Sequence, residues 1–306
     1  MRVLVTGARG KVGRAAVRAL AEAGHEVMGS DLVRGVFDTP DPGDPESWYT
    51  QADLSDAGEA FATVRGADAV VHAAAIPEPT KNPAHVVFQN NLMSTFNALE
   101  AAIRFGVPRF VNLSSETVPG FFFPERPVTP DYVPVDEEHP IRPQDPYATA
   151  KSFGEQLMDA AVRRSDIRCI SIRPSWVQWE GNYERNLGPL VRDPSRLTAG
   201  FWSYIDVYDL ADGIRLAVES DLPGHEVFYI ASPDNAGGRP FADAVREHYG
   251  DSVEIRETDR DDAGGISIAK ARRMLGYSPT RSWRDYLDEE GRLRPEPRRR
   301  LEAGGF

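Results

Sequence analysis

A tyrosine and a lysine stand four residues apart in the segment Tyr147-Ala148-Thr149-Ala150-Lys151. On a helix, positions i and i+4 share one face, so the phenol and the ammonium would point the same way. A free phenol has a pKa of about 10 and needs help to act as a base at neutral pH. A neighbouring ammonium gives that help because it favours the phenolate. The pair is therefore a candidate for removing a proton from an alcohol, with Tyr147 as the base.

The residues before Tyr147 predict where its helix begins. Asp145 is a good N-cap residue, and Pro146 suits the first helical position. Tyr147 then falls in the first turn, where the helix dipole favours an anion. A Tyr-x-x-x-Lys spacing is also common on surface helices, so other groups must stand beside it before it indicates catalysis.

Two further polar groups are candidates for the same site. Ser114 and Ser115 follow the apolar run 110–113, which predicts hydroxyls at the carboxyl end of a strand. Ser115 is preferred for orienting the reacting oxygen because it leads into the loop 116–120. Asn91 could hold a helix backbone or a proton-relay water, and the alternative is a simple helix-start residue.

Strands and helices alternate over the first 170 residues of the chain. Strands are predicted at residues 2–5, 26–30, 69–72, 110–113 and 168–172, and helices at 14–23, 95–104 and 148–163. Such alternation implies βαβ units with a parallel sheet and right-handed crossovers. The predicted fold class is α/β, a doubly wound parallel sheet of the Rossmann type, with the strand carboxyl ends facing a ligand crevice.

The regular pattern ends after residue 172. Residues 173–204 mix Pro, Trp, Asn and Gly, and then a helix is predicted at 207–219 and a strand at 227–230. Short helices at 241–248 and 269–275 indicate a small C-terminal substrate-binding cap. The predicted parts are a dinucleotide-binding domain (1–172 plus 205–231), the cap (173–204 plus 232–288) and a loose tail (289–306).

A glycine-rich turn lies between the first strand and the first helix, where residues 6–13 read Thr-Gly-Ala-Arg-Gly-Lys-Val-Gly. Gly7 permits a tight turn, Gly10 lets the backbone approach a pyrophosphate, and Gly13 allows close helix–strand packing. The helix N-terminus adds free N–H donors and a positive dipole. Such turns also occur without ligands, but this position favours a dinucleotide. The predicted contacts are Gly7, Arg9, Gly10, Lys11, Val12 and Gly13.

Asp31 ends the second predicted strand, 18 residues beyond Gly13. A carboxylate there can accept both ribose hydroxyls and would repel a 2′-phosphate. The sequence therefore predicts NAD rather than NADP as the cofactor, although Arg34 could blunt the repulsion.

The next two strand ends supply further cofactor contacts. Asp53-Leu54 ends the presumed third strand, where a carboxylate could bond the adenine amino group. His72, Ala73 and Ala74 end the fourth, where small side chains let the backbone lie against the cofactor. For His72 the competing interpretation is a packed strand-end histidine.

Composition narrows the classes of function. The formal net charge of −12 disfavours nonspecific binding to nucleic acid or anionic lipid. The single cysteine, Cys169, excludes an internal disulfide and any multi-cysteine metal site, and we expect no metal. Cys169 lies in an apolar run and is expected to be a buried strand residue. The apolar N-terminal stretch is too short for a signal peptide or a membrane span, so a cytoplasmic location without a membrane partner is expected.

The order of these features resembles the extended short-chain dehydrogenase/reductase family, also called the NAD-dependent epimerase/dehydratase family, over roughly residues 1–230. The motifs that carry the resemblance are the glycine turn, Asp31, Asp53, His72 to Ala75, Asn91 with Asn97, Ser114-Ser115, Tyr147 with Lys151, Arg173-Pro174 and the segment 204–209. The resemblance implies a catalytic triad of Ser115, Tyr147 and Lys151. It also implies NAD contacts from Asn91, Tyr147, Lys151 and Pro174. Members of the family often dimerise through helices that begin near Pro83 and Pro146, so a homodimer is expected.

The segment between Arg173 and Asp206 points to a small substrate. It is shorter than the segment that holds nucleotide-diphosphate sugars in the family, and it resembles that of small-substrate members such as uronate dehydrogenases. The implied reaction is hydride transfer between NAD and a sugar, sugar acid or related polyol. The expected substrate contacts are Ser115, Glu116, Tyr147, Ser175 and Arg185. Arg185 is the candidate for a substrate carboxylate or phosphate, and the alternative is a surface arginine.

Other interpretations stay open. Trp176 and Trp179 could stack on a sugar ring or pack in the core. Residues 121–132 could form a lid over the substrate or an inert surface loop. An epimerase or dehydratase of nucleotide sugars with tightly bound NAD is the main alternative function, and a noncatalytic NAD-binding protein is another.

Overall fold

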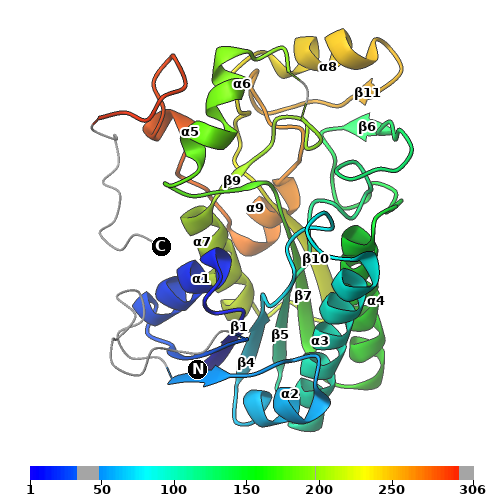
Figure 1. Ribbon diagram of the computed structural model, residues 1–306, viewed down its shortest axis with the longest axis vertical. Coiled ribbons are helices and arrows are strands. Elements are labelled where there is room, and N and C mark those ends of the chain that lie inside the picture. The colour runs from blue at the N-terminus through cyan, green and yellow to red at the C-terminus, as the bar shows by residue number, and fades with distance from the viewer. Residues whose placement is uncertain (33–47, 197, 296–306) are drawn as a thin grey trace.

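The computed structural model describes residues 1–32, 48–196 and 198–295 (Figure 1). At its centre is a seven-stranded sheet in which every pairing is parallel. The strands are β1 (Arg2–Thr6), β2 (Glu26–Asp31), β3 (Trp48–Gln51), β4 (Ala69–His72), β5 (Arg109–Leu113), β7 (Arg168–Pro174) and β10 (His225–Ile230). All six strands whose bounds were predicted are present, with ends that differ by at most two residues.

The strand order is β10-β7-β5-β4-β1-β2-β3. The chain builds outward from β1 through β2 to β3, and then returns to the other side of β1 to add β4. The direction of winding therefore reverses between β1 and β4, where a doubly wound sheet opens a crevice at its carboxyl edge. This order confirms the predicted fold class.

Helices cover both faces of the sheet (Figure 1). On one face, α1 (Lys11–Glu22) packs against α7 (Val207–Glu219). On the other, α3 (Ala84–Arg104) lies between α2 (Ala57–Val64) and α4 (Pro146–Arg164). Each helix contributes an apolar face to a core of buried aliphatic residues. Within the described ranges, no helix is long and apolar enough to cross a membrane.

The cap lies beyond the carboxyl edge of the sheet (Figure 1). Its elements are β6 (Tyr132–Val133), β8 (Val177–Gln178), α5 (Tyr183–Asn186), α6 (Gly188–Arg192), β9 (Ile205–Asp206), α8 (Phe241–Tyr249), β11 (Glu254–Ile255), α9 (Ala269–Leu275) and the 3₁₀ helix η1 (Trp283–Asp285). Tyr183 and Leu187 pack with Trp283 and Tyr286 in an aromatic core, where the rings of Tyr183 and Tyr286 stack 4.3 Å apart. The 173–204 segment is therefore part of the packed cap.

The predicted loose tail is partly wrong. Leu293 pairs with Leu287 in an antiparallel bridge, and the Asp288 N–H donates to the Arg292 carbonyl at 2.9 Å. The Gly291 backbone lies directly against Gly188. Residues 289–295 thus form a turn on the cap, and the rest of the tail, 296–306, lies outside the described residues.

A buried ion pair joins the sheet to α4. The guanidinium of Arg173, on β7, donates to both carboxylate oxygens of Glu155, at 2.8 and 2.7 Å. Ser114 donates to the same carboxylate at 2.6 Å, and the Tyr229 hydroxyl lies 3.4 Å from Arg173. Burial alone lowers the pKa of Arg173, but the hydrogen bonds from its guanidinium to Glu155 outweigh burial and raise the pKa.

Removing the charge of Glu155 should destabilise the whole domain. Glu155→Gln leaves the Arg173 guanidinium unpaired in the core, and we expect a loss of roughly 3–5 kcal/mol in the free energy of unfolding. Urea denaturation followed by circular dichroism measures it. The matched control is Glu100→Gln, which removes the partner of the half-exposed Arg164 and should cost less than about 1 kcal/mol. Equal losses in the two variants would contradict the structural role of the buried pair.

Candidate active site

The glycine turn after β1 has the shape that a dinucleotide pyrophosphate needs. Gly7 has a φ of 68°, and a Cβ there would lie 2.8 Å from the Ala73 and Ala74 backbone. A Cβ on Gly13 would lie 2.0 Å from the Gly7 carbonyl oxygen. Gly10 is the N-cap of α1 and carries no side chain, so a phosphate can approach the backbone at the start of the helix closely. These residues fit NAD.

Lys11, the first residue of α1, packs against the cap beside this turn. The Lys11 ammonium sits 3.7 Å from the centre of the Trp179 ring, a cation–π contact between α1 and the cap. Partial burial lowers the pKa of Lys11, and the charges of Arg14 and Arg185 add to that effect. Trp179 therefore packs on Lys11, whereas Trp176 is exposed. Arg185 is an exposed residue of α5, near the cofactor turn.

Asp31 lies at the carboxyl end of β2, where a ribose would be held. Its Oδ2 accepts the Arg9 backbone N–H at 3.0 Å, and its Oδ1 accepts that of Leu32 at 2.8 Å. The central carbon of the Arg9 guanidinium lies over the Tyr49 ring, 4.4 Å from the ring centre. Sequence reasoning missed Tyr49, whose only signal was an aromatic at the third strand. Arg34 lies outside the described residues.

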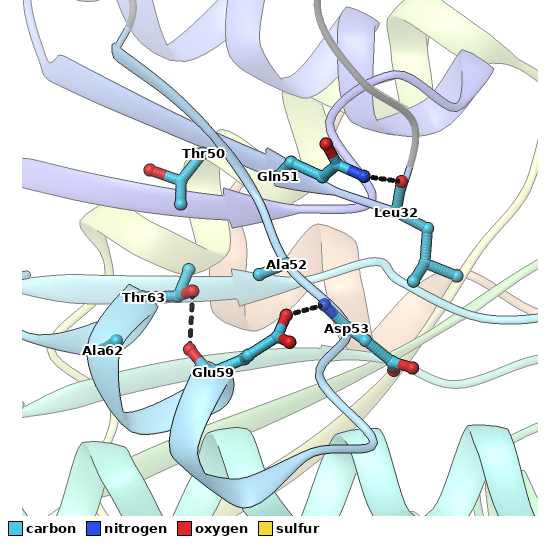
Figure 2. Close-up of a pocket in the computed structure, with 8 residues that line it drawn as sticks. All are labelled: Leu32, Thr50, Gln51, Ala52, Asp53, Glu59, Ala62 and Thr63. Atoms are coloured by element: carbon cyan, nitrogen blue, oxygen red, sulfur yellow. Dashed lines mark hydrogen bonds between the residues drawn. The ribbon is translucent and has the colours of Figure 1, made fainter.

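A cavity of about 440 Å³ opens at the carboxyl end of β2 and β3 (Figure 2). It is lined by Leu32, Thr50, Gln51, Ala52, Asp53, Glu59, Ala62 and Thr63. The Asp53 N–H donates to Glu59 at 2.7 Å, and Figure 2 shows the Asp53 side chain directed away from Glu59. Leu54 is buried, and Asn97 donates to its carbonyl at 3.0 Å. The cavity lies where the adenine was predicted to bind.

His72 is a packed strand-end residue. Its side chain is fully buried, and its Nδ1 lies 3.0 Å from the Thr6 hydroxyl, which also accepts the Ala74 N–H at 3.2 Å. Burial, reinforced by the charge of Lys151, lowers the pKa of His72 to about 3. Its imidazole is thus packed in the core, as in the competing interpretation, and the cofactor contact of the segment that it begins stays a prediction. It positions the Ala73-Ala74 backbone against the glycine turn.

Tyr147 begins α4 as the sequence predicted. Asp145 is the N-cap and accepts the N–H groups of Tyr147 and Ala148, both at 2.9 Å, with Pro146 at the first helical position. The phenol is buried, and the Ser115 side chain is near enough to lower its pKa. The Ser114 hydroxyl instead donates to Glu155, so it is engaged with that carboxylate.

The ionisation of Tyr147 and Lys151 corrects one prediction. The sequence predicted a lowered phenol pKa, but burial raises the pKa of Tyr147 to about 12, and the nearby Ser115 side chain offsets only part of this. Burial also lowers the pKa of Lys151 to about 8. The Lys151 ammonium lies 5.8 Å from the centre of the phenol ring and donates to the Leu113 carbonyl at 2.6 Å. Both shifts disfavour charge, as expected in a site with little water.

The side chain of Asn91 hydrogen-bonds the backbone of the loop after β4. It lies two turns inside α3, and its side chain bonds both the N–H and the carbonyl of Ile76, at 2.7 and 2.9 Å. Those bonds fix the loop that follows β4. The backbone that it holds belongs to a loop and not to a helix as predicted, and Asn91 lies well inside α3 and not at its start; the contact with a proton-relay water stays a prediction.

Glu116 and Ser175 are joined by a buried hydrogen bond. The Ser175 hydroxyl donates to Glu116 at 2.7 Å, and the Glu116 N–H donates to the Pro174 carbonyl at 3.2 Å. Of the other predicted substrate residues, Ser115 and Tyr147 are buried and Arg185 is exposed on α5.

The aromatic stretch that follows Ser115 packs on the cap. The ring centres of Phe121 and Phe201 lie 5.4 Å apart, and the tip of the Phe122 ring lies close to Gly200. The first part of this stretch is therefore packed against the cap.

Two further expectations concern cysteine and metals. Cys169 is buried in β7, as predicted, and burial raises the pKa of its thiol to about 12. Among the residues that the structure describes, no group of three or more His, Cys, Asp or Glu side chains could hold a metal ion.

The doubly wound sheet and the glycine cradle define an NAD-binding enzyme of the short-chain dehydrogenase/reductase type. The model of the NAD dependent epimerase/dehydratase family matches residues 3–192. The chain belongs to this family.

Curated relatives include both dehydrogenases and epimerases. The chain is 30% identical over 232 residues to uronate dehydrogenase from Pseudomonas syringae, covering 76% of this chain and 74% of that protein. It is 26% identical over 317 residues to UDP-glucose 4-epimerase from Corynebacterium glutamicum, covering 91% of each.

Solved structures show the same fold. A UDP-galactose 4-epimerase matches with a TM-score of 0.68 at 27% identity, covering 95% of this chain and 96% of that one. A short-chain dehydrogenase/reductase superfamily protein from Agrobacterium tumefaciens, solved with bound NAD, matches with a TM-score of 0.70 at 23% identity, covering 92% and 94%.

Burial of neutral His72 should make the protein sensitive to acid. Its folded-state pKa of about 3 lies below its usual 6.5, so the unfolded chain takes up the proton first. The stabilising contribution is complete above about pH 6.5 and falls as the pH drops toward 3, by at most about 1.4 kcal/mol per unit. Denaturant titrations at pH 7, 6 and 5 measure this slope. The free energy of unfolding of His72→Asn should be lower than that of the wild type at pH 7 and should change less with pH. The control variant His85→Asn, at an exposed histidine, should keep the pH dependence of the wild type. An unchanged slope in His72→Asn would refute the assignment.

Proposed function

We propose that the protein is an NAD-dependent dehydrogenase that oxidises a hydroxyl-bearing carbon of a small sugar, sugar acid or polyol. The observation that carries the proposal is the buried Tyr147 phenol in the first turn of α4, near Ser115 at the carboxyl end of β5. This is the edge at which a dinucleotide would lie, since the glycine turn opens there.

Each residue has a distinct task in the proposed reaction. Tyr147 takes the hydroxyl proton, and Ser115 orients the oxygen that loses it. Lys151 binds the nicotinamide ribose, and its ammonium lies 5.8 Å from the centre of the phenol ring. NAD, when bound, accepts the hydride. Asn91 acts on the site through the Ile76 backbone that it holds.

The packing of the cap supports a small substrate. Residues 183–190 are the part of the cap that would have to hold a nucleotide diphosphate. Tyr183, Leu187 and Leu190 are instead buried in the aromatic core, and Gly188 lies against Gly291. Little of this segment is available to a nucleotide, so a free sugar fits better.

The proposed base can be tested by removing one oxygen atom. Tyr147→Phe should lower kcat/KM for NADH formation by about 10²–10⁴-fold, the usual contribution of a general base. The wild-type rate should rise with pH through the alkaline range, because burial raises the pKa of Tyr147 to about 12. Both are measured by NADH absorbance with a panel of free sugars, uronates and polyols.

The matched control for Tyr147→Phe is Tyr277→Phe. Tyr277 is also buried, and its hydroxyl has no hydrogen-bond partner within the described residues, so its loss should leave kcat/KM unchanged. Full activity in Tyr147→Phe would refute the mechanism. Turnover of UDP-sugars without net NADH would establish the nucleotide-sugar epimerase alternative, and binding of NAD without any turnover would establish a noncatalytic protein.

We also propose a homodimer formed through α3 and α4. The two helices pack side by side and expose large apolar side chains to the outside. These are Val86, Met93, Phe96 and Phe153, each 37–42% exposed. Apolar residues on neighbouring helix faces suit a self-complementary interface in a twofold dimer.

A charge on this face should separate the protomers. Phe153→Glu would place a carboxylate in the apolar contact, and we expect the mass measured by light scattering after size exclusion to halve. Leu293→Glu, at an equally exposed leucine of the C-terminal turn, should keep the wild-type mass. A monomeric wild-type protein at micromolar concentration would exclude the dimer.

A further inference from the structure

A tryptophan of the cap contacts the first residue of the helix that follows the glycine turn. Trp179 comes directly after β8, and Lys11 is the first residue of α1. The Lys11 ammonium lies 3.7 Å from the centre of the Trp179 ring. Because the pyrophosphate of a dinucleotide lies at the N-terminus of this helix, the contact joins the cap to the sheet domain beside the cofactor.

The Trp179 ring is held by contacts that do not involve Lys11. It packs on an apolar cluster between α1 and α7, whose buried members are Ala15, Val207 and Ala211. The Trp179 N–H donates to the Asn182 side chain at 2.7 Å, and the Asn182 N–H donates to the Trp179 carbonyl at 2.9 Å. Asn182 is itself buried. The ring therefore sets the position of the flexible lysine side chain, and not the reverse.

The charges around Lys11 suit an anion. The protein has a formal net charge of −12, yet positive charges gather here. Burial is the main cause of the lowered pKa of Lys11, and the charges of Arg14 and Arg185 add to it, so cations of α1 and of the cap lie within electrostatic range of one another. The Trp179 ring attracts the ammonium without supplying a negative charge, so this contact does not neutralise Lys11. A pyrophosphate among these cations relieves their repulsion and gains from the helix dipole.

We propose that Trp179 is a positioning residue for the cofactor: its ring holds the Lys11 ammonium at the first turn of α1, where the ammonium pairs with the pyrophosphate of NAD. The glycine turn accounts for backbone contacts with the pyrophosphate, and the inference adds a charge that the cap keeps in place. It goes beyond the proposed function, because it concerns the binding of NAD and holds for any substrate. The cap thus contributes to cofactor affinity through Lys11.

The charge of Lys11 is tested with ligands that share the adenosine group. Isothermal titration of the nucleotide-free protein measures the Kd of NAD, of ADP-ribose, which keeps the pyrophosphate, and of adenosine, which lacks it. Lys11→Met keeps most of the apolar stem and should raise the Kd of NAD and of ADP-ribose about tenfold, as for a hydrogen bond to a charged group. The Kd of adenosine should not change. The matched control is Lys270→Met, at a lysine that lies over the Phe228 ring of the edge strand β10, which should leave all these values unchanged.

Ionic strength separates a charge from packing. The Kd of NAD for the wild type should rise with the concentration of sodium chloride, because salt screens an ion pair near the surface. In Lys11→Met this rise should be smaller, since one cation of the site is gone.

The positioning role of Trp179 is tested with variants of the ring. Trp179→Leu should raise the Kd of NAD about two- to fivefold, the contribution of an exposed cation–π contact. Trp179→Phe keeps an aromatic face and should recover part of this loss. In the Lys11→Met background, Trp179→Leu should have no further effect, since the ring acts through the ammonium. The control is Trp176→Leu, at an exposed tryptophan of the same segment, which should leave the Kd of NAD unchanged.

The other outcomes overturn the inference. An unchanged Kd of NAD in Lys11→Met would show that the ammonium does not reach the cofactor, and an equal loss for adenosine would show a general disturbance of the site. The same loss from Trp179→Leu in both backgrounds would show that the ring only packs. Melting temperatures identify a variant that does not fold, and Trp179→Phe then carries the comparison. A protein that binds NAD but oxidises no sugar or polyol would contradict the proposed function and leave this inference intact.

Discussion

The position of the site depends on the buried pair of Arg173 and Glu155. It joins β7 to α4, and it draws in Ser114 from β5 and Tyr229 from β10. A buried ion pair adds little net stability, because desolvation offsets most of its attraction. The contribution of the pair is to fix the position of α4 relative to the sheet. Glu155 lies about two turns beyond Tyr147 and one beyond Lys151 on the same helix, so anchoring its carboxylate sets the height of both residues along the sheet edge.

The side chains of the resulting site are buried, and this burial sets their protonation states. Burial raises the pKa of Tyr147 to about 12 and lowers the pKa of Lys151 to about 8, so it disfavours the charged form of both groups. At neutral pH the phenol is therefore neutral, whereas most of Lys151 still carries its charge. His72, held neutral by the same burial, adds no competing charge to this part of the core.

The sheet was predictable from sequence because its signals are local. Apolar β-branched runs gave the strands, and the Asp145-Pro146 cap placed α4 with its tyrosine. Where tertiary packing decides, prediction was incomplete. The polar residues Asn90 and Asn91 resembled a helix start, yet α3 begins at Ala84, since Asn91 is satisfied by the Ile76 backbone. The irregular segment 173–204 has no periodicity because its residues fill an aromatic core built with Trp283 and Tyr286, about a hundred residues away.

The same distinction between local signals and tertiary packing applies to the residues of the site. The glycine turn and the Tyr147 motif are contiguous, so spacing revealed them. Whether Arg185 and Glu116 share a site depends on how the cap folds back over the sheet, and no spacing contains that information. Arg185 lies on the short helix α5 of the cap and is exposed, whereas Glu116 follows β5 and is buried against Ser175. The packing of the cap on the sheet decides which ionisable side chains face the same space, and residue spacing alone cannot give it.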